Sequence, residues 1–343
     1  MEKQIGFGII GTGNIAKLHA RCIEAIPYAK LLGVVSKTKS RAESVQEYFS
    51  SPVFCEIDQL LKTPDLEIVC VCNESGHHLE TISKIAKYGI NILCEKPLEI
   101  TTDRIDTISK IIKEHNVKLG CVFQNRMNPE FIQLKKILAE GLLGKILLVQ
   151  TSVNWYRSSE YYEDSWRGTK EIDGGATFIN QGIHTIDLMI NLIGEVVEIS
   201  GFIDTLHHNI EGEDVGVASF RFKNGALGTL SGGTALYPGE PESIGVFGTL
   251  GNVQFKGGQI VSSSLPEINS LLNIKRDSNG SGASDPMAIG DQFHIDSITN
   301  MIAAVKDEKE PLVGVNEAIK SVAFINALYR SEGNIENIIN NKK

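Results

Sequence analysis

Short apolar runs alternate with amphipathic stretches through the first 120 residues of the chain. β-Branched residues are frequent in the runs, which favours strands, whereas the stretches between them repeat their apolar positions at helical spacing. Strands are predicted at residues 5–10, 30–35, 68–71, 91–94 and 118–123, and helices at residues 15–26, 40–48, 78–87 and 103–115. Such an alternation is typical of a parallel sheet, so this part of the chain is predicted to be a doubly wound α/β domain.

The pattern changes after residue 123. Alternating runs such as VGVASFRF and ESIGVFGT are separated by glycine-rich turns, which indicates a largely antiparallel, open sheet. The pair Asn224-Gly225 between two of these runs predicts a tight hairpin. Helices are predicted at residues 128–140, 177–192, 290–307 and 315–330. The chain is therefore expected to have two domains, a doubly wound domain over residues 1–123 and an α+β domain over residues 124–343.

Residues 261–289 contain the serine- and glycine-rich segments SSS and SNGSGASD. Segments of this composition are typical of flexible loops. We expect a mobile loop there, which acts either as a lid or only as a connection without a role of its own.

Composition narrows the classes of function. The chain has 343 residues, enough for about two domains, and 42% of them are hydrophobic, which excludes disorder, collagen and coiled coil as the main architecture. The net charge is −9, from 33 Lys+Arg and 42 Asp+Glu, so a nucleic-acid partner is not expected. The N-terminus does not resemble a secretion signal and no apolar run is long enough for a membrane span, which predicts a cytoplasmic protein without a membrane partner.

The six cysteines all lie within the first 121 residues and none forms a C-x-x-C pair. Reduced structural thiols are therefore expected, and no metal site.

A glycine-rich turn stands between the first predicted strand and the first predicted helix. Its sequence is Gly11-Thr12-Gly13-Asn14-Ile15-Ala16. In this position the first glycine permits a tight turn, the second lets a pyrophosphate approach the backbone, and the helix directs free N–H groups at the phosphates. The sequence predicts a dinucleotide site contacted by Gly11, Gly13, Asn14 and Ile15; the alternative is a turn that is merely tight.

The end of the second predicted strand bears on the choice of cofactor. An acidic residue there commonly binds the ribose 2′-hydroxyl of NAD, but residues 36–41 contain no carboxylate. Ser36, Lys37 and Arg41 supply a hydroxyl and cations that suit a 2′-phosphate. The cofactor is predicted to be NAD(P), with NADP favoured over NAD, unless these cations are ordinary surface charges at the start of a helix.

Two further motifs follow in the order Glu95-Lys96-Pro97 and G-G-x(4)-N-x-x-x-H, the latter ending with Asn180 and His184. With the glycine turn, they make the whole chain resemble the glucose-fructose oxidoreductase and inositol dehydrogenase family, written Gfo/Idh/MocA. The resemblance implies an N-terminal Rossmann domain and a C-terminal substrate domain. It also implies an NAD(P)-dependent oxidoreductase acting on sugars or cyclitols, and pairing of subunits into a homodimer or homotetramer.

Lys96 lies just beyond the carboxyl end of a predicted strand, where open α/β sheets bind their ligands. An ammonium group there can hydrogen-bond a substrate hydroxyl or the carbonyl formed from it, and so stabilise negative charge. The resemblance gives Lys96 this role, gives Pro97 a cis peptide bond that directs the lysine, and has Glu95 orient the cofactor or the lysine. The alternative for Lys96 is an ordinary solvated lysine.

Asn180 and His184 are four residues apart on a predicted helix and therefore point the same way. An imidazole suits a group that takes a proton from an alcohol near neutral pH, so His184 is the predicted general base, or general acid in reduction. The inositol dehydrogenase branch has Asp where Asn180 stands. Asparagine resembles the branches that act on nucleotide-linked amino sugars, such as UDP-N-acetylglucosaminuronate 3-dehydrogenases.

The resemblance extends to several further positions. A role as a buried anchor is the alternative for Gln124, Arg126, Trp166 and Arg167, and plain surface packing is the alternative for Tyr156. Cofactor contacts are implied for Asn73, Ser75, His78, Glu95, Lys96, Gln124, Trp166 and Arg167, and substrate contacts for Lys96, Arg126, Tyr156, Asn180 and His184.

The predicted function is hydride transfer between nicotinamide and a secondary hydroxyl or ketone of a sugar, sugar nucleotide or cyclitol. Among these, a UDP-N-acetylglucosaminuronate 3-dehydrogenase-like reaction is favoured. The alternatives are an inositol dehydrogenase, an NAD-dependent glycosidase that oxidises its sugar transiently, and a regulator that binds a dinucleotide without catalysis. The joint presence of Lys96 and His184 argues against the regulator.

Overall fold

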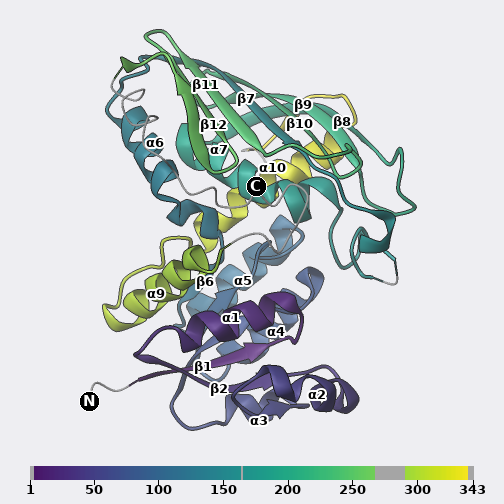
Figure 1. The fold of residues 1–343 in the computed structure, drawn as a ribbon, viewed down its shortest axis with the longest axis vertical. Helices are drawn as coiled ribbons and strands as arrows, with labels where there is room; N and C mark the ends of the chain where they lie inside the picture. The colour runs from purple at the N-terminus through teal and green to yellow at the C-terminus, as the bar shows by residue number, and fades with distance from the viewer. Residues whose placement is uncertain (1–3, 164, 267–289, 339–343) are drawn as a thin grey trace. The chain divides into compact units, whose positions relative to one another are not determined.

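A computed structural model describes residues 4–163, 165–266 and 290–338 (Figure 1). The chain divides into two compact units, Met1–Gln124 with Asp291–Ile319 and Asn125–Gly290 with Lys320–Lys343. The first boundary falls one residue from the position predicted from sequence. The segment 291–319, which the sequence-based division gave to the second domain, instead belongs to the first unit.

This difference has a physical cause in helix α9 (Gln292–Lys306). Its buried residues Ile298, Met301 and Ile302 join the core that the first sheet forms with helix α1 (Asn14–Glu24). The hydrophobic pattern of residues 290–307 predicts the helix, but a pattern does not state which core the helix covers.

A six-stranded parallel sheet forms the first unit. Its strand order is β3-β2-β1-β4-β5-β6, the order of a Rossmann fold. The strands are β1 (Ile5–Ile10), β2 (Ala29–Val35), β3 (Val53–Phe54), β4 (Leu66–Val71), β5 (Asn91–Cys94) and β6 (Leu119–Cys121). Every residue of β1 is buried, as expected for a strand covered on both faces. The predicted doubly wound fold is confirmed.

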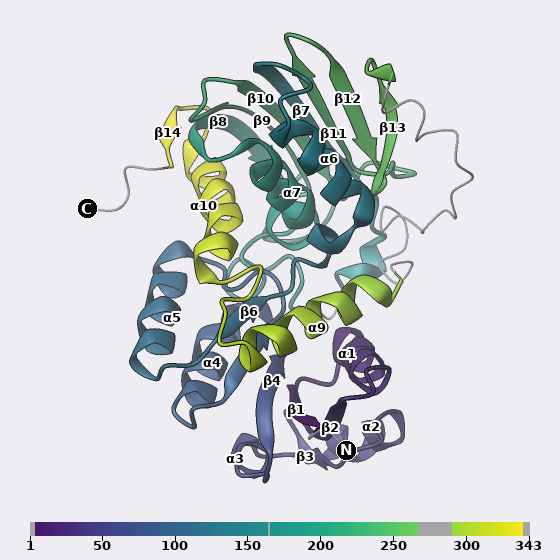
Figure 2. The same cartoon turned by 90° about the vertical axis from the view of Figure 1, so that its left-hand side faces the viewer.

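Helices cover both faces of this sheet, with α1 and α9 on one side and α4 and α5 on the other (Figure 2). The helices not yet bounded are α2 (Lys39–Val45), α3 (Ile57–Leu61), α4 (His78–Ala86) and α5 (Thr102–Glu114). Thr38 and Thr101 cap α2 and α5, because each hydroxyl accepts a hydrogen bond from a backbone N–H of the first turn.

The second unit contains an eight-stranded sheet of order β13-β12-β11-β7-β10-β9-β8-β14. Neighbouring strands are antiparallel except β10 and β7, which are parallel. The strands are β7 (Ile146–Asn154), β8 (Val196–Asp204), β9 (Val215–Phe222), β10 (Leu227–Gly233), β11 (Ser243–Gly248), β12 (Asn252–Lys256), β13 (Gln259–Ser263) and β14 (Glu336–Asn337). The predicted antiparallel class is confirmed, and β9 and β10 form the predicted hairpin.

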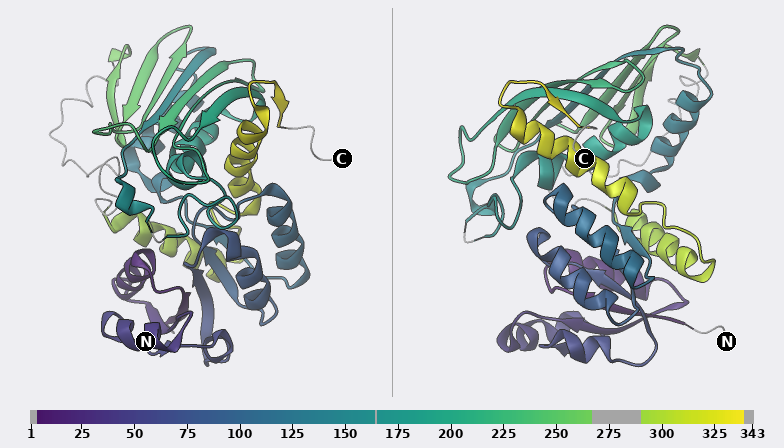
Figure 3. Two further views of the ribbon diagram at one scale, coloured as in Figure 1. Left: turned by 90° about the vertical axis from the view of Figure 1, so that its right-hand side faces the viewer. Right: turned by 180° about the vertical axis from the view of Figure 1, so that it is seen from behind.

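Three helices pack on one face of this sheet, α6 (Pro129–Ala139), α7 (Ile183–Ile193) and α10 (Val315–Ser331), as Figure 3 shows. Phe131 of α6 contacts Phe255 of β12, and Phe324 of α10 contacts Phe220 of β9. The predicted loop over residues 261–289 begins inside β13, whereas its part from 267 to 289 lies outside the described residues. No helix in the described part of the chain is long and apolar enough to cross a membrane.

Candidate functional site

The glycine turn after β1 is shaped by a close approach of backbone. Gly11 has φ +115°, and a side chain there would overlap the carbonyl oxygen of Cys72 at the end of β4. Its N–H donates a hydrogen bond to the carbonyl oxygen of Val35 on β2, 3.0 Å away. Gly11 therefore lies between the ends of β2 and β4, the two strands that flank β1, where only a residue without Cβ fits.

The start of α1 fits a negatively charged ligand. Gly13 is the N-cap residue and has no side chain with which to cap the N–H groups of the first turn. Apart from Gly13 and its two chain neighbours, no atom of the described residues lies within 4 Å of the position that a Cβ on Gly13 would occupy, so the space beside this turn is open within the described part of the chain. Free helix N–H groups and the positive end of the helix dipole attract phosphate. The residues present therefore fit the pyrophosphate of a dinucleotide, with Asn14 and Ile15 in the first helical turn.

A carboxylate missed by the sequence analysis lies near the end of β2. The Nζ atom of Lys37 is 3.5 Å from Oε1 of Glu74, a residue that follows β4. Burial opposes the charged form of Glu74, but a backbone hydrogen bond and the ammonium group of Lys37 lower the pKa of its carboxyl. Of the other residues predicted here, Ser36 is buried. The backbone N–H of Arg41 donates a hydrogen bond to the hydroxyl of Thr38. No motif marks Glu74, because its proximity depends on the pairing of remote strands.

Lys96 follows β5 at the same edge of the sheet. The N–H of Glu95 donates to the carbonyl oxygen of Val71 at the end of β4, 2.9 Å away, which places the loop beside that strand. Lys96 is half-buried between buried neighbours, and the Lys96–Pro97 peptide is cis, as the resemblance implied. His78 anchors this loop, because its Nδ1 lies 2.9 Å from the carbonyl oxygen of Pro97.

The contacts of His78 differ from those expected of a cofactor ligand. Its ring is buried, and its Nε2 lies 3.2 Å from the carbonyl oxygen of Asn73, so both nitrogens contact the protein backbone. Ser75 is buried as well, and the Asn73 side chain donates to Thr81. The contacts of His78 are those of a structural anchor.

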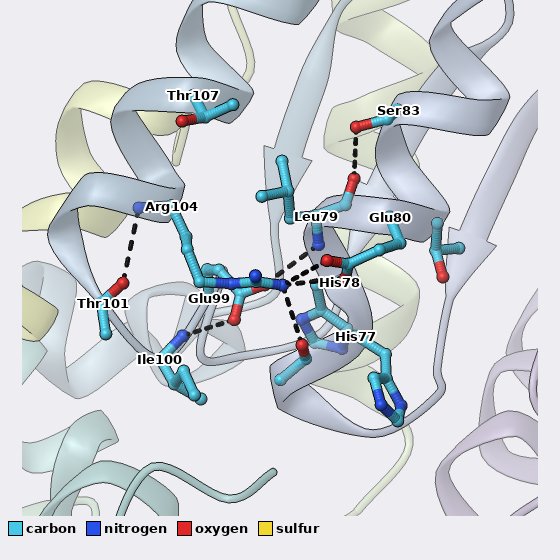
Figure 4. Close-up of polar contacts among 12 residues, drawn as sticks. His77, His78, Leu79, Glu80, Ser83, Glu99, Ile100, Thr101, Arg104 and Thr107 are labelled. Carbon is cyan, nitrogen blue, oxygen red and sulfur yellow. Dashed lines mark hydrogen bonds and ion pairs between the residues drawn. The ribbon is translucent and has the colours of Figure 1, made fainter. Parts of the chain in front are cut away.

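Beyond Lys96, the loop is fixed by the buried carboxylate of Glu99 (Figure 4). Glu99 accepts hydrogen bonds from the backbone N–H groups of Leu79, at 3.0 Å, and Ile100, at 2.8 Å. Arg104 of α5 pairs with Glu99 at 3.1 Å and also with Glu80 of α4. A loop held to two helices in this way can present Lys96 in one orientation.

Behind the loop, Glu95 forms a buried ion pair with His19 of α1. The distance from His19 Nε2 to Glu95 Oε1 is 2.7 Å, and both side chains are buried. Burial opposes both charges, but Cys70 and Glu95 raise the pKa of His19 to about 10, while His19 lowers the pKa of Glu95 to about 2. At neutral pH the pair is therefore an imidazolium and a carboxylate.

The pair predicts a pH dependence of stability on the alkaline side. Because the pKa of His19 is raised, its stabilising contribution is complete below about pH 6.5 and is lost as the pH rises through about 10. We expect His19→Gln to flatten the decline of melting temperature between about pH 7 and pH 10, measured by circular dichroism. The wild type and His19→Gln share all other titrating groups. Parallel curves of melting temperature against pH for the two proteins would therefore contradict the raised pKa of His19.

In the second unit, Asn180 and His184 lie on a helix that begins unusually. Residues Thr177–Gly182 are π-helical, and α7 continues from Ile183, whereas the sequence predicts a helix without distinguishing the two forms. Asn180 and His184 are half-buried while the apolar side chains between and before them are buried. π-Helical turns are frequent at functional sites, so the departure supports a special role for this segment.

Glu213 holds the beginning of the π-helix. Its carboxylate accepts hydrogen bonds from the N–H groups of Ala176, at 3.2 Å, and Phe178, at 2.8 Å, and from the hydroxyl of Tyr329 at 2.7 Å. Gly175 has φ +147°, and a side chain there would overlap the Tyr329 hydroxyl. The glycine of the motif therefore makes room for the group that positions the helix.

Asn180 is oriented by a carboxylate that the sequence analysis did not assign. Its Nδ2 donates to Oδ1 of Asp173 at 2.7 Å, and its Oδ1 accepts from Gln181 Nε2 at 3.1 Å. Gln181 also donates to the Tyr161 hydroxyl and accepts from Arg157, each at 2.8 Å. Asp173 immediately precedes the glycine motif, which is a signal that could have identified it.

The other predicted contacts of this unit fall into two groups. Arg167 lies over the ring of Tyr161, with its Cζ 4.7 Å from the centroid, and Trp166 and Tyr156 are half-buried. Arg126 is instead buried and forms a bidentate ion pair with the two carboxylate oxygens of Asp187, each at 2.7 Å. Its guanidinium thus has the contacts of a structural anchor.

Gln124 is the last predicted contact residue of the first unit. Gln124 is buried, and its Oε1 has no hydrogen-bond partner within the residues that the structure describes. The same part of the chain contains no group of three or more His, Cys, Asp or Glu residues that could hold a metal ion.

Two family models match the chain. The model described as oxidoreductase family, NAD-binding Rossmann fold, matches residues 5–123, and the model described as GFO/IDH/MocA C-terminal domain matches residues 131–254.

Individual proteins show the same similarity. Uncharacterized oxidoreductase YrbE of Bacillus subtilis (strain 168) is 29% identical over 262 residues, 74% of this chain and 74% of that protein. Inositol 2-dehydrogenase of Rhizobium meliloti (strain 1021) is 23% identical over 340 residues, 95% of this chain and 96% of that one. The crystal structure of the WlbA dehydrogenase from Bordetella pertussis in complex with NADH and UDP-GlcNAcA is 27% identical. Its TM-score is 0.83, with 96% of this chain and 97% of that chain covered.

Proposed function

The chain belongs to the GFO/IDH/MocA family of NAD-binding oxidoreductases, and from this premise we propose that it oxidises a secondary alcohol of a nucleotide-linked amino-sugar acid to the ketone, or reduces that ketone to the alcohol. The reaction class is that of UDP-N-acetylglucosaminuronate 3-dehydrogenases. Inositol dehydrogenation is the alternative within the same family.

One observation carries the choice of substrate. Asn180 takes the place of the Asp of the inositol dehydrogenase branch, and it is fixed between Asp173 and Gln181 by two hydrogen bonds. A fixed amide can orient a sugar hydroxyl but cannot hold a proton, which leaves the proton to a neighbouring group. The similarity to a WlbA dehydrogenase that binds UDP-GlcNAcA supports the same substrate class.

In the proposed mechanism, Lys96 donates a hydrogen bond to the oxygen of the reacting carbon. Its positive charge stabilises the negative charge that develops on that oxygen. His184 removes the hydroxyl proton during oxidation and returns it during reduction. When bound, the nicotinamide supplies the acceptor or donor of the hydride.

We propose that the cofactor is held by the glycine turn and by the start of α1, through the N–H groups around Gly13, Asn14 and Ile15. Trp166 and Arg167 are proposed cofactor contacts from the second unit, and Tyr156 remains a proposed substrate contact. In well-oriented intramolecular reactions, proximity and orientation of the reactants can lower the barrier by about 7–11 kcal/mol.

We further propose a preference for NADP. Residues 36–41 contain no carboxylate, and two exposed cations lie there, Lys37 just after β2 and Arg41 in the first turn of α2. We expect NADP to bind about tenfold more tightly than NAD, since a charge-assisted hydrogen bond contributes about 1.5–3 kcal/mol. The double variant Lys37→Ala/Arg41→Ala is expected to remove the difference, measured by quenching of protein fluorescence.

Lys30→Ala is the matched control, because Lys30 is an exposed cation at the other end of the same strand. Its affinities should equal those of the wild type. Tighter binding of NAD than of NADP would overturn the preference and would indicate that the Glu74 carboxylate binds the ribose hydroxyl.

A substrate panel tests the proposed function. Purified protein is incubated with NAD or NADP and with UDP-N-acetylglucosaminuronate, free aldoses or inositols, and nicotinamide absorbance is followed. We expect the nicotinamide cofactor to be reduced when UDP-N-acetylglucosaminuronate is the substrate. Turnover of inositols alone would place the chain in the inositol branch, whereas release of a leaving group without net reduction would indicate the glycosidase reaction.

We propose that the chain forms a homodimer or homotetramer through the open face of its eight-stranded sheet. Phe202, Val217 and Leu227 are exposed there, on three adjacent strands, with Phe202 directly opposite Val217. Exposed apolar side chains that gather on one face favour association. Light scattering after gel filtration measures the assembly, and a monomer at micromolar concentration would overturn it.

A further inference from the structure

The carboxylate of Glu95 contacts two parts of the first unit at once. Its Oε1 pairs with Nε2 of His19, and its Oε2 accepts the backbone N–H of Lys96 at 3.3 Å. His19 belongs to α1, the helix that begins at the glycine turn. A continuous set of contacts therefore runs from the proposed cofactor helix to the backbone of the proposed catalytic lysine.

We propose that His19 is a positioning residue, whose charged ring fixes the carboxylate of Glu95 and thereby the backbone from which the Lys96 side chain extends. The inference rests on the proposed role of Lys96. It assigns a function to a histidine that none of the sequence motifs includes.

Burial strengthens the attraction between the charged ring of His19 and the carboxylate of Glu95. The exposed fractions of His19 and Glu95 are 1% and 7%, so water screens their attraction weakly. Removing one partner of such a pair leaves the other charge buried and uncompensated. Glu95 would then be free to turn away from the backbone N–H of Lys96 or to take up a proton, and in either case the loop loses its fixed orientation.

The groups that face the pair come from three further elements. Cys70 of β4 lies beside His19, and Cys72 follows the same strand beside Glu95. His294 of α9 contacts the His19 ring edge-on, with centroids 5.9 Å apart, and the positive charge of Lys96 helps to lower the pKa of Glu95. Burial lowers the pKa of His294 to about 4, so it is neutral at pH 7 and leaves His19 as the cation within this buried group.

A structural role alone does not account for the arrangement. Buried ion pairs frequently stabilise a fold no better than apolar residues of the same size would. Fixing one of several possible orientations is the better-supported use of such pairs. Here the element fixed is the loop that carries Lys96, which is also held on its other side by Glu99 and His78.

Steady-state kinetics of His19→Gln tests the proposal with the substrate identified in the panel. Glutamine keeps a hydrogen-bond donor but not the charge. We expect kcat to fall by about ten- to hundredfold, since a misplacement of about 1 Å costs about 10²-fold, while KM for the cofactor stays within about threefold. The double variant His19→Gln/Glu95→Gln should be no slower than Glu95→Gln, because both changes break the same contact.

His208→Gln is the matched control, since His208 is a buried histidine of the second unit whose Nε2 contacts the carbonyl oxygen of Thr234. It is expected to lose stability but to keep kcat. A His19→Gln enzyme with wild-type kcat would overturn the proposal, as would equal losses of kcat in the two histidine variants. Unchanged activity of Lys96→Ala would instead refute the proposed function, so the two failures are distinguishable.

A measurement on the wild type covers the case in which His19→Gln does not fold. Nitrogen-15 NMR of the histidine rings distinguishes the charged ring from the neutral one. We expect His19 to be charged at about pH 8, where an ordinary histidine is neutral. A neutral His19 at that pH would overturn the proposal.

Discussion

Replacing Lys96 with alanine is expected to lower kcat by about 10²–10³-fold, the usual cost of losing one donor that stabilises developing negative charge. Binding of the dinucleotide should be retained, because the glycine turn and the start of α1 are unchanged by the substitution. Stopped-flow measurement of nicotinamide reduction separates the chemical step from product release. The loss should therefore appear in the hydride-transfer phase.

Lys87→Ala provides the control for this experiment. Lys87 is an exposed lysine that ends α4, so its loss changes the total charge equally without altering the loop after β5. It should have the kcat of the wild type. A Lys96→Ala enzyme with full activity would remove the central assignment of the mechanism.

Replacing His184 with alanine is the second substitution with a large expected effect. General acid–base catalysis contributes about 10²–10⁴-fold, so kcat/KM should fall by that amount in the oxidation direction. The pH profile should change as well. The wild type is expected to lose activity at acid pH, where an imidazole base is protonated, and the variant should lack this limb.

The corresponding control is His115→Ala at the end of α5, a half-buried histidine that belongs to the first unit and is outside the proposed machinery. Its pH profile should match that of the wild type. An unaltered acid limb in His184→Ala would show that another group takes the proton.

The sequence predicts most of the fold because strands buried on both faces leave an unambiguous pattern. The predicted bounds of β1 and β5 are those observed. By contrast, β3 has two residues and α3 has five, which is too short for a periodicity to stand out, and neither was predicted. The π-helical start of the segment with Asn180 was missed for a different reason, since the spacing of apolar residues predicts a helix without distinguishing a π-helix from an α-helix.

The candidate site was predictable where residue type and strand position together specify chemistry. The glycine turn and Lys96 both follow ends of parallel strands, which is where such sheets bind ligands. The residues that were missed have roles that depend on their partners in the fold, and only His19 lies far from its partner, Glu95, in the sequence. His19, Glu99 and Asp173 are ordinary polar residues until the fold brings Glu95, Arg104 and Asn180 to them.

Because α9 belongs to the first unit, a fragment that folds as this unit must include α9 as well as the N-terminal residues. A cofactor-binding domain cut after Gln124 would lack Ile298, Met301 and Ile302, and would expose the apolar surface that these side chains cover. Such a truncation is expected to aggregate. A fusion that joins residues 4–124 to residues 291–319 through a short linker would restore the cover, and would allow dinucleotide affinity to be measured on a soluble half-molecule.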